Sequence, residues 1–190
     1  STFQSAARGF LIATFASVAL ASLGALVPAL KQGVDRFAAS LHAIPLIALG
    51  PIFIVLLSRD GTPTAVAALA AYFPIFVATA SGLEAASQAH MEVFTALGAD
   101  RRTRLRRLEV PAALPAFADG LRLATPAAVI GAILGEWFGA PRGIGLLIVS
   151  SMQNFQITLL WSAALLAAAG SILAFTVFGA LERYVVARYR

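Results

Sequence analysis

Five long apolar segments make up most of the 190-residue chain and restrict what it can fold into. A bilayer core about 30 Å thick is crossed by about 20 apolar helical residues, because each residue of a helix rises about 1.5 Å. None of the segments alternates as a β-barrel strand does, so all five are predicted to be membrane-spanning helices. They run approximately over Gly9–Leu30, Leu41–Ser58, Thr62–Leu83, Ala112–Gly135 and Ile157–Leu181. The expected fold class is all-α, a polytopic transmembrane helix bundle with residues 1–190 as one domain.

The second segment is shorter than the others and is interrupted by Pro45 and Pro51, which predicts a kinked helix packed among its neighbours. Small residues are abundant in every segment, most clearly around Ala65–Ala71 and Ala163–Gly170. Because small side chains let helix backbones approach closely, the sequence favours a compact bundle over five separate anchors.

Composition agrees with a membrane protein and excludes several other classes. Only 12% of the residues are charged and the mean hydropathy is +0.85, whereas a soluble domain has about 25% charged residues. The net charge of +5 is explained by membrane topology without a nucleic-acid partner. The chain has no cysteine and only two isolated histidines, His42 and His90, so neither a metal centre nor a cofactor is expected.

Lys and Arg residues are distributed unevenly between the two sides of the predicted bundle. Ten lie on the side of the loop between the third and fourth spans and three on the other side, with Arg122 inside a span. The ten are Lys31, Arg36, Arg101, Arg102, Arg104, Arg106, Arg107, Arg183, Arg188 and Arg190, and the three are Arg8, Arg59 and Arg142. Since cytoplasmic loops carry the basic excess, the loop and the carboxyl end are predicted to be cytoplasmic and Ser1 external. Such chains usually start inside, so one further helix is expected before Ser1.

The loop over residues 85–111 is the longest polar stretch and predicts two short helices. Ser87 can cap a first helix with an apolar face, and Gly98 stands where that helix would end in the left-handed region. Asp100 can cap a second helix, which Pro111 is expected to limit. From periodicity alone, the loop is either a rigid element that offers its apolar face to a partner or an amphipathic connector on the lipid headgroups.

Glu92, Gly98, Leu108, Val110 and Pro111 have a spacing that resembles the EAA loop of the permeases of binding-protein-dependent ABC importers. Val93 and Phe94 replace the two alanines of that pattern, and a literal EAA string at residues 84–86 lies out of register. The resemblance implies that the loop couples the chain to an ATPase. The implied coupling residues are Glu92, Val93, Phe94, Gly98, Ala99, Asp100, Arg101, Leu108 and Pro111.

Other parts of the chain resemble the nitrate, sulfonate and taurine group of these permeases, in the runs IPLIALGPIFIVLL, YFPIFVATASGL and GEWFGAPRGIGLLI. The resemblance implies a MetI-like permease fold in the bacterial inner (plasma) membrane that forms the pathway for a small solute such as nitrate, a sulfonate or taurine. It also implies the partners: two copies of an ABC ATPase, a periplasmic or lipid-anchored substrate-binding protein, a second permease copy in a homodimer, and membrane lipid.

The fourth span carries the candidate pathway residues Asp119, Arg122, Thr125 and Glu136. Asp119 and Arg122 are spaced to form either an ion pair on one helix face or a substrate contact. Glu136 either faces the pathway or lies in the interface with water. The turn over residues 139–145 is either an outer gate or docking surface, or a plain connector. The arginines of residues 101–107 either bind anionic lipid, contact the ATPase or enforce topology.

No catalytic set is recognisable in the sequence. There is no phosphate-binding GxxxxGK[ST] run and no Ser/His/Asp constellation, so the chain itself is not expected to be an enzyme and ATP would be hydrolysed by a partner. The alternative function is an ion-driven carrier or channel that acts without an ATPase, although such proteins usually place ionisable residues in the middle of their spans.

Overall fold

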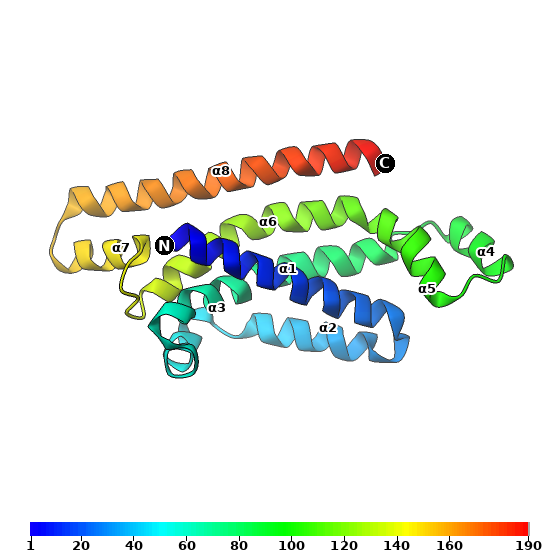
Figure 1. Cartoon of the computed structure of the whole chain (residues 1–190), viewed down its shortest axis with the longest axis horizontal. Helices are drawn as coiled ribbons and strands as arrows, with labels where there is room; N and C mark the ends of the chain where they lie inside the picture. Colours follow the sequence, from blue (N-terminus) through cyan, green and yellow to red (C-terminus); the bar gives the residue numbers. More distant parts are fainter. Residues whose placement is uncertain (190) are drawn as a thin grey trace.

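The computed structural model describes residues 1–189, in which every regular element is a helix. Arg190, one of the ten basic residues counted above, lies outside the described residues. The elements are α1 (Thr2–Leu26), α2 (Pro28–Ala43), α3 (Leu46–Glu84), α4 (Gln88–Ala96), α5 (Arg101–Arg104), η1 (Leu105–Glu109), α6 (Val110–Glu136), α7 (Ile144–Gln153) and α8 (Ile157–Tyr189). Figure 1 shows the long helices lying side by side, with α4 and α5 projecting at one end of the bundle and α7 at the other. The predicted all-α membrane bundle is confirmed.

The predicted number of spans is wrong, because within residues 1–189 four helices and not five are long and apolar enough to cross a membrane. The segment predicted as the second span, Leu41–Ser58, is not one helix. Pro45 has no backbone N–H and disfavours the helical conformation for Ile44, which is extended at φ −73° and ψ 125°. After Pro45, the first part of α3 runs from Leu46 to Ser58. There a φ of 66° and a ψ of 174° interrupt the helix, which resumes after this kink. The piece before this kink is about 20 Å long, too short to cross a bilayer core.

Helix α2 returns the chain from one end of the bundle to the other, running back alongside α1 (Figure 1). Near its start Lys31 pairs with Glu84 at the end of α3, while Gly50, beyond its far end, packs against Phe138 just after α6. Helix α2 has 16 residues and carries Lys31, Asp35 and Arg36, so it is shorter and more polar than the four span helices. Because of this return, α1 and α3 run in the same direction.

Small residues bring α1, α3 and α6 into close contact, as the sequence predicted. A Cβ at Gly9 of α1 would lie 2.6 Å from the Cβ of Ala67 in α3, and one at Gly120 of α6 would lie 2.5 Å from the Cβ of Ala78. Both distances are too short for real Cβ atoms, so only glycine allows these helices to pack this closely. The buried residues of α1 recur at every third or fourth position: Thr2, Ala6, Gly9, Ala13, Ser17, Ala21 and Gly24.

Helices α5, η1 and α6 form one continuous helix, so the expectation that Pro111 limits the second loop helix is wrong. A single turn of π-helix, Leu105–Glu109, precedes the proline, and the Val110 N–H donates to the Leu105 carbonyl five residues back. Pro111 follows this turn directly and stands in the first turn of α6. The second half of the loop and the fourth span are therefore one continuous helical rod from Arg101 to Glu136.

Candidate functional site

The loop over residues 85–111 folds largely as its local signals predict. Helix α4 follows Ser87, which occupies the N-cap position although its side chain makes no capping hydrogen bond. Gly98 has a φ of +69°, in the left-handed region expected of it. Asp100 caps α5 by accepting from the Thr103 N–H at 3.2 Å. Hydrogen bonding by the Thr103 side chain, together with its backbone N–H, holds the pKa of the Asp100 carboxyl below its ordinary value.

Helix α4 stands apart from the rest of the chain. It contains no buried residue, and Glu92 at its centre is exposed. Val93 and Leu97 are 55% and 79% exposed, while Phe94 is half-buried. Exposed apolar side chains beside an exposed carboxylate are typical of a surface that a partner protein covers. The geometry thus agrees with a docking helix.

Beyond α4, Gly98 and Asp100 are exposed, and the other predicted loop residues are partly buried. Ala99 and Arg101 are half-buried, as are Leu108 in η1 and Pro111 in α6. Glu109, which the sequence did not single out, is only 2% exposed. Its Oε1 accepts from the Nη1 of Arg101 at 2.8 Å. No local pattern marked Glu109, because its burial depends on how the loop packs against α1.

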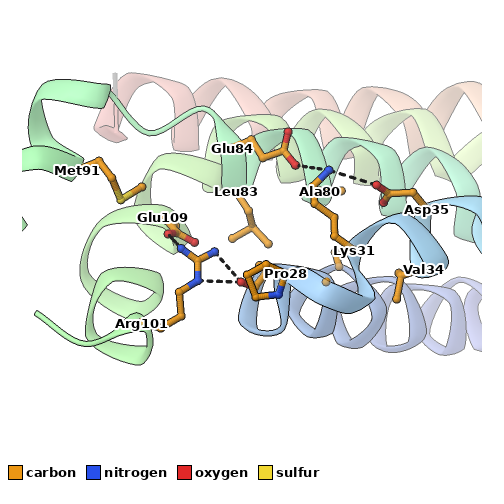
Figure 2. Close-up of a pocket in the computed structure, with 13 residues that line it drawn as sticks. Pro28, Lys31, Val34, Asp35, Ala80, Leu83, Glu84, Met91, Arg101 and Glu109 are labelled. Atoms are coloured by element: carbon orange, nitrogen blue, oxygen red, sulfur yellow. Dashed lines mark hydrogen bonds and ion pairs between the residues drawn. The ribbon is translucent and has the colours of Figure 1, made fainter. Parts of the chain in front are cut away.

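A pocket of about 300 Å³ lies between the loop and the α1–α2 turn (Figure 2). On one side Arg101 bridges Glu109 and the carbonyl of Ala25. On the other side Lys31 pairs with Glu84 at 2.8 Å and with Asp35 at 3.2 Å. The hydrogen bond with Glu84, followed by that with Asp35, raises the pKa of Lys31. These charged groups join α1, α2, α3 and the loop at one end of the bundle.

Of the candidate pathway residues on α6, Arg122 makes a different pair from the one expected. Its Nη1 lies 2.8 Å from the Oε2 of Glu182 in α8, and its guanidinium stacks over Phe175 at 4.2 Å from the ring centroid. Asp119 is exposed, and the expected pair between Asp119 and Arg122 is not formed. The sequence could not reveal this pairing, because Arg122 and Glu182 are 60 residues apart in the chain.

Thr125 and Glu136 are buried within the chain. Thr125 is 5% exposed, donates to the Arg122 carbonyl at 2.8 Å, and lines an apolar pocket between α1, α6 and α8. Glu136 is 1% exposed within the chain. Its Oε2 accepts from the Thr2 hydroxyl at 3.0 Å and from the Gly145 N–H at 2.8 Å. The Thr2 hydroxyl oxygen in turn accepts from the Ile144 N–H at 2.8 Å.

Glu136 therefore fixes the turn between α6 and α7 to the start of α1. Gly143 and Gly145 are required for this, since a Cβ at either position would lie within 3.0 Å of the Glu136 side chain. Gly139 and Gly143 have φ values of 88° and 148°, which only glycine adopts readily. The turn over residues 139–145 is thus built around a buried carboxylate.

Replacing the Glu136 carboxylate should destabilise the protein, and the loss of stability should be larger when fewer of its hydrogen bonds remain. Glu136→Gln keeps a carbonyl oxygen as an acceptor, whereas Glu136→Leu introduces an apolar side chain and leaves the Thr2 hydroxyl and the Gly145 N–H without an acceptor. Each buried unsatisfied donor costs about 1–3 kcal/mol, so we expect Leu to lower the thermal unfolding temperature in detergent much more than Gln does. Equal stability of the two variants would contradict this role.

Comparison with known proteins identifies the chain. The family model described as "Binding-protein-dependent transport system inner membrane component" matches residues 9–190. The chain belongs to this family. Its membership, together with the four long apolar helices in the described part of the chain, makes it a multi-pass protein of the bacterial inner membrane.

Curated relatives of this chain include proteins named for different solutes. The formylaminopyrimidine transport permease protein ThiX of Halalkalibacterium halodurans is 42% identical over 116 residues, which are 60% of this chain and 46% of the relative. The putative aliphatic sulfonates transport permease protein SsuC of Bacillus subtilis is 27% identical over 152 residues, 80% of this chain and 55% of the relative. The chain thus spans about half the length of these relatives.

A solved structure confirms the MetI-like fold expected from the sequence. A chain from the inward-facing MetNI methionine ABC transporter has a TM-score of 0.77 and 19% identity to this chain. The match covers 97% of this chain and 90% of the other. At this identity the comparison shows the shared fold alone.

Proposed function

We propose that this chain is the permease subunit of an ATP-driven importer, and that residues 85–111 couple it to a separate ATPase. The observation that carries the proposal is the structure of the loop that holds the family spacing. Helix α4 presents the exposed Glu92 with no buried residue of its own, and it is joined at the left-handed Gly98 to a rod that continues into α6. A helix that the rest of the chain leaves uncovered can enter a cleft in a partner, and a rigid rod can transmit the resulting movement.

The experiment is to co-express the full-length permease with a tagged ATPase subunit and to measure co-purification and ATP hydrolysis. We expect a stable complex whose formation requires α4, with ATP hydrolysed by the partner. As a matched control, Arg183→Gln alters an exposed side chain of α8 outside the loop and should leave the complex intact. A permease that transports its solute in vesicles without any ATPase would instead support an ion-driven carrier.

Two copies of the permease are proposed to enclose the pathway. Within one chain, α3 and α6 pack at glycine contacts, with a Cβ at Gly135 lying 2.6 Å from the Cα of Pro63, so this pair leaves no channel between its helices. The exposed face of α6 carries Asp119, Leu123 and Ile130. Facing a second copy across a twofold axis, this face would line a pathway between subunits. Thr125 and Glu136 point to other parts of their own chain, so the pathway role proposed for α6 rests on its exposed face.

Single-cysteine labelling should distinguish this face from the rest of the bundle, because the chain has no cysteine of its own. We expect cysteines at Asp119, Leu123 and Ile130 to react with a water-soluble thiol reagent in the assembled transporter. Cysteines at the buried positions Ala124 and Ala132 should not react, and neither should those over residues 165–178 of α8, which we assign to the lipid side. Reaction along α8 with none at Ile130 would contradict the proposed pathway.

The solute is proposed to be small and polar, of the nitrate, sulfonate or taurine type. The similarity to SsuC supports this class, and the similarity to ThiX supports a formylaminopyrimidine-type solute as a second candidate. Calorimetric titration of the partner substrate-binding protein with an alkanesulfonate, taurine, nitrate and formylaminopyrimidine would choose between them. Submicromolar binding of only the pyrimidine would exclude the anion class.

A further inference from the structure

Few contacts connect α4 to the rest of the chain, and one of them comes from α5. The Nη1 of Arg104 donates to the Thr95 hydroxyl in α4 at 3.2 Å. Thr95 lies one turn after Glu92, near the end of α4. Since α4 has no buried residue, this hydrogen bond helps to fix the position of α4 relative to the rod that continues into α6.

One turn earlier on α5, Arg101 connects the same rod to the end of α1. Its Nε and Nη2 both donate to the carbonyl of Ala25, at 2.9 and 2.5 Å, and its Nη1 donates to Glu109 (Figure 2). Ala25 lies in the last turn of α1, where carbonyls lose their intrahelical partners and a cation is favoured. Arg101 thus occupies a helix end that is 76 residues away in the sequence.

Arg101 and Arg104 are three residues apart and so lie on the same face of α5. We propose that these two arginines are positioning residues that carry movement of α4 to the α1–α2 corner. The proposal rests on the function proposed above, in which α4 is the element that the ATPase moves. It assigns to Arg101 an intramolecular contact with α1 in place of a direct contact with the ATPase.

The physical properties of the contacts support this link. Arg101 makes three charge-assisted hydrogen bonds from one planar group, which fixes its orientation as well as its distance. Glu109, the last residue of η1, forms the ion pair with this guanidinium from a buried position. The other charged contact at this corner, between Lys31 and Glu84, joins two side chains that are about half exposed, and such surface pairs contribute little. The pocket of about 300 Å³ beside Arg101 leaves space for the corner to move.

The test uses two reporter positions in the full-length permease assembled with its ATPase. Ala96→Cys places a fluorescent label on α4, and Ala29→Cys places one at the start of α2, just past the α1–α2 turn; both residues are exposed. The probe is ATP with orthovanadate, so no transported solute is needed. In the otherwise unsubstituted transporter we expect trapping to shift the emission of both labels.

Arg101→Gln by itself would leave the buried Glu109 carboxylate without its cation and could prevent folding. The informative variant is therefore Arg101→Gln combined with Glu109→Gln, which removes the buried charge along with the contact to Ala25. We expect this variant to assemble, to retain the shift at Ala96, and to show a shift at Ala29 that is smaller by about fivefold or more. Arg104→Gln, which creates no buried charge, should also reduce the shift at Ala29.

Glu109→Gln alone keeps the contact between Arg101 and Ala25 and should preserve most of the response at Ala29. Arg183→Gln, at an exposed position on α8 outside the loop, should preserve all of it. A full response at Ala29 in both the double variant and Arg104→Gln would overturn the link while leaving the proposed function intact. If the Ala96 label of the unsubstituted transporter does not respond, or if no ATPase assembles with it, the proposed function fails and the link fails with it.

Discussion

Glu92→Lys should abolish the coupling of transport to ATP hydrolysis while leaving the chain folded and inserted in the membrane. Glu92 is exposed on a helix without buried residues, so its replacement removes no contact on which folding depends. In the complex, a reversed charge at the centre of the docking helix would oppose the partner surface. Disrupting a charge pair buried at an interface costs about 2–5 kcal/mol, equivalent to about thirtyfold or more in affinity. The measurements are ATPase co-purification and solute uptake in vesicles.

Two further variants test whether the glutamate of the motif is Glu92 or the Glu84 of the literal EAA string. Glu84→Gln changes the literal EAA string and should be nearly silent, because the contact between Glu84 and Lys31 is an exposed pair. Gly98→Asp should impair coupling through the backbone conformation and the added charge and not through a clash, since a Cβ at Gly98 would meet no atom within 4 Å. Its cost is the left-handed conformation, about 1 kcal/mol or more. A larger defect in Glu84→Gln than in Glu92→Lys would mean that the chosen register is wrong.

The sequence predicted most accurately the features that depend on local signals. The end of α4 at Gly98 and the cap of α5 at Asp100 were predicted because a left-handed glycine and an N-cap carboxylate act within a few residues. The four apolar helices were predicted because lipid requires long runs of apolar residues.

Features that depend on tertiary packing were not predicted. The π-helical turn before Pro111 allows a helix to continue where a proline normally ends it, and nothing in the local sequence indicates such a turn. The return of the chain through α2 was missed because its polar residues made it resemble a loop. Arg122 has a suitable neighbour at Asp119, yet its partner is Glu182, because α8 packs against α6. Likewise, only the folded chain brings Arg101 to the carbonyl of Ala25.

The contact between α3 and α6 should be the most sensitive part of the bundle to an added side chain. A Cβ at Gly131 would lie 2.7 Å from the Cβ of Ala70 and 2.8 Å from both the Cα of Ala67 and the carbonyl oxygen of Val66. Two of these three atoms belong to the backbone of α3, so they can move away only if the whole helix moves. Helix α4 is attached to α3 on one side and to the rod containing α6 on the other. The contact between α3 and α6 therefore also sets the position of the two attachment points of α4.

We therefore expect Gly131→Leu to destabilise the protein by about 3 kcal/mol or more, at the upper end of what overpacking costs. The variant should unfold at a clearly lower temperature in detergent and accumulate poorly in membranes. The matched control is Gly33→Leu on α2, where a Cβ would meet nothing within 4 Å. That substitution adds the same side chain at an exposed helical position, and leucine favours the helix over glycine by about 0.5–1 kcal/mol, so the control should be neutral or slightly stabilising. Similar unfolding temperatures for the two variants would show that α3 and α6 are not held by close glycine packing. A large difference would locate the rigidity needed to transmit movement from the loop in this pair of helices.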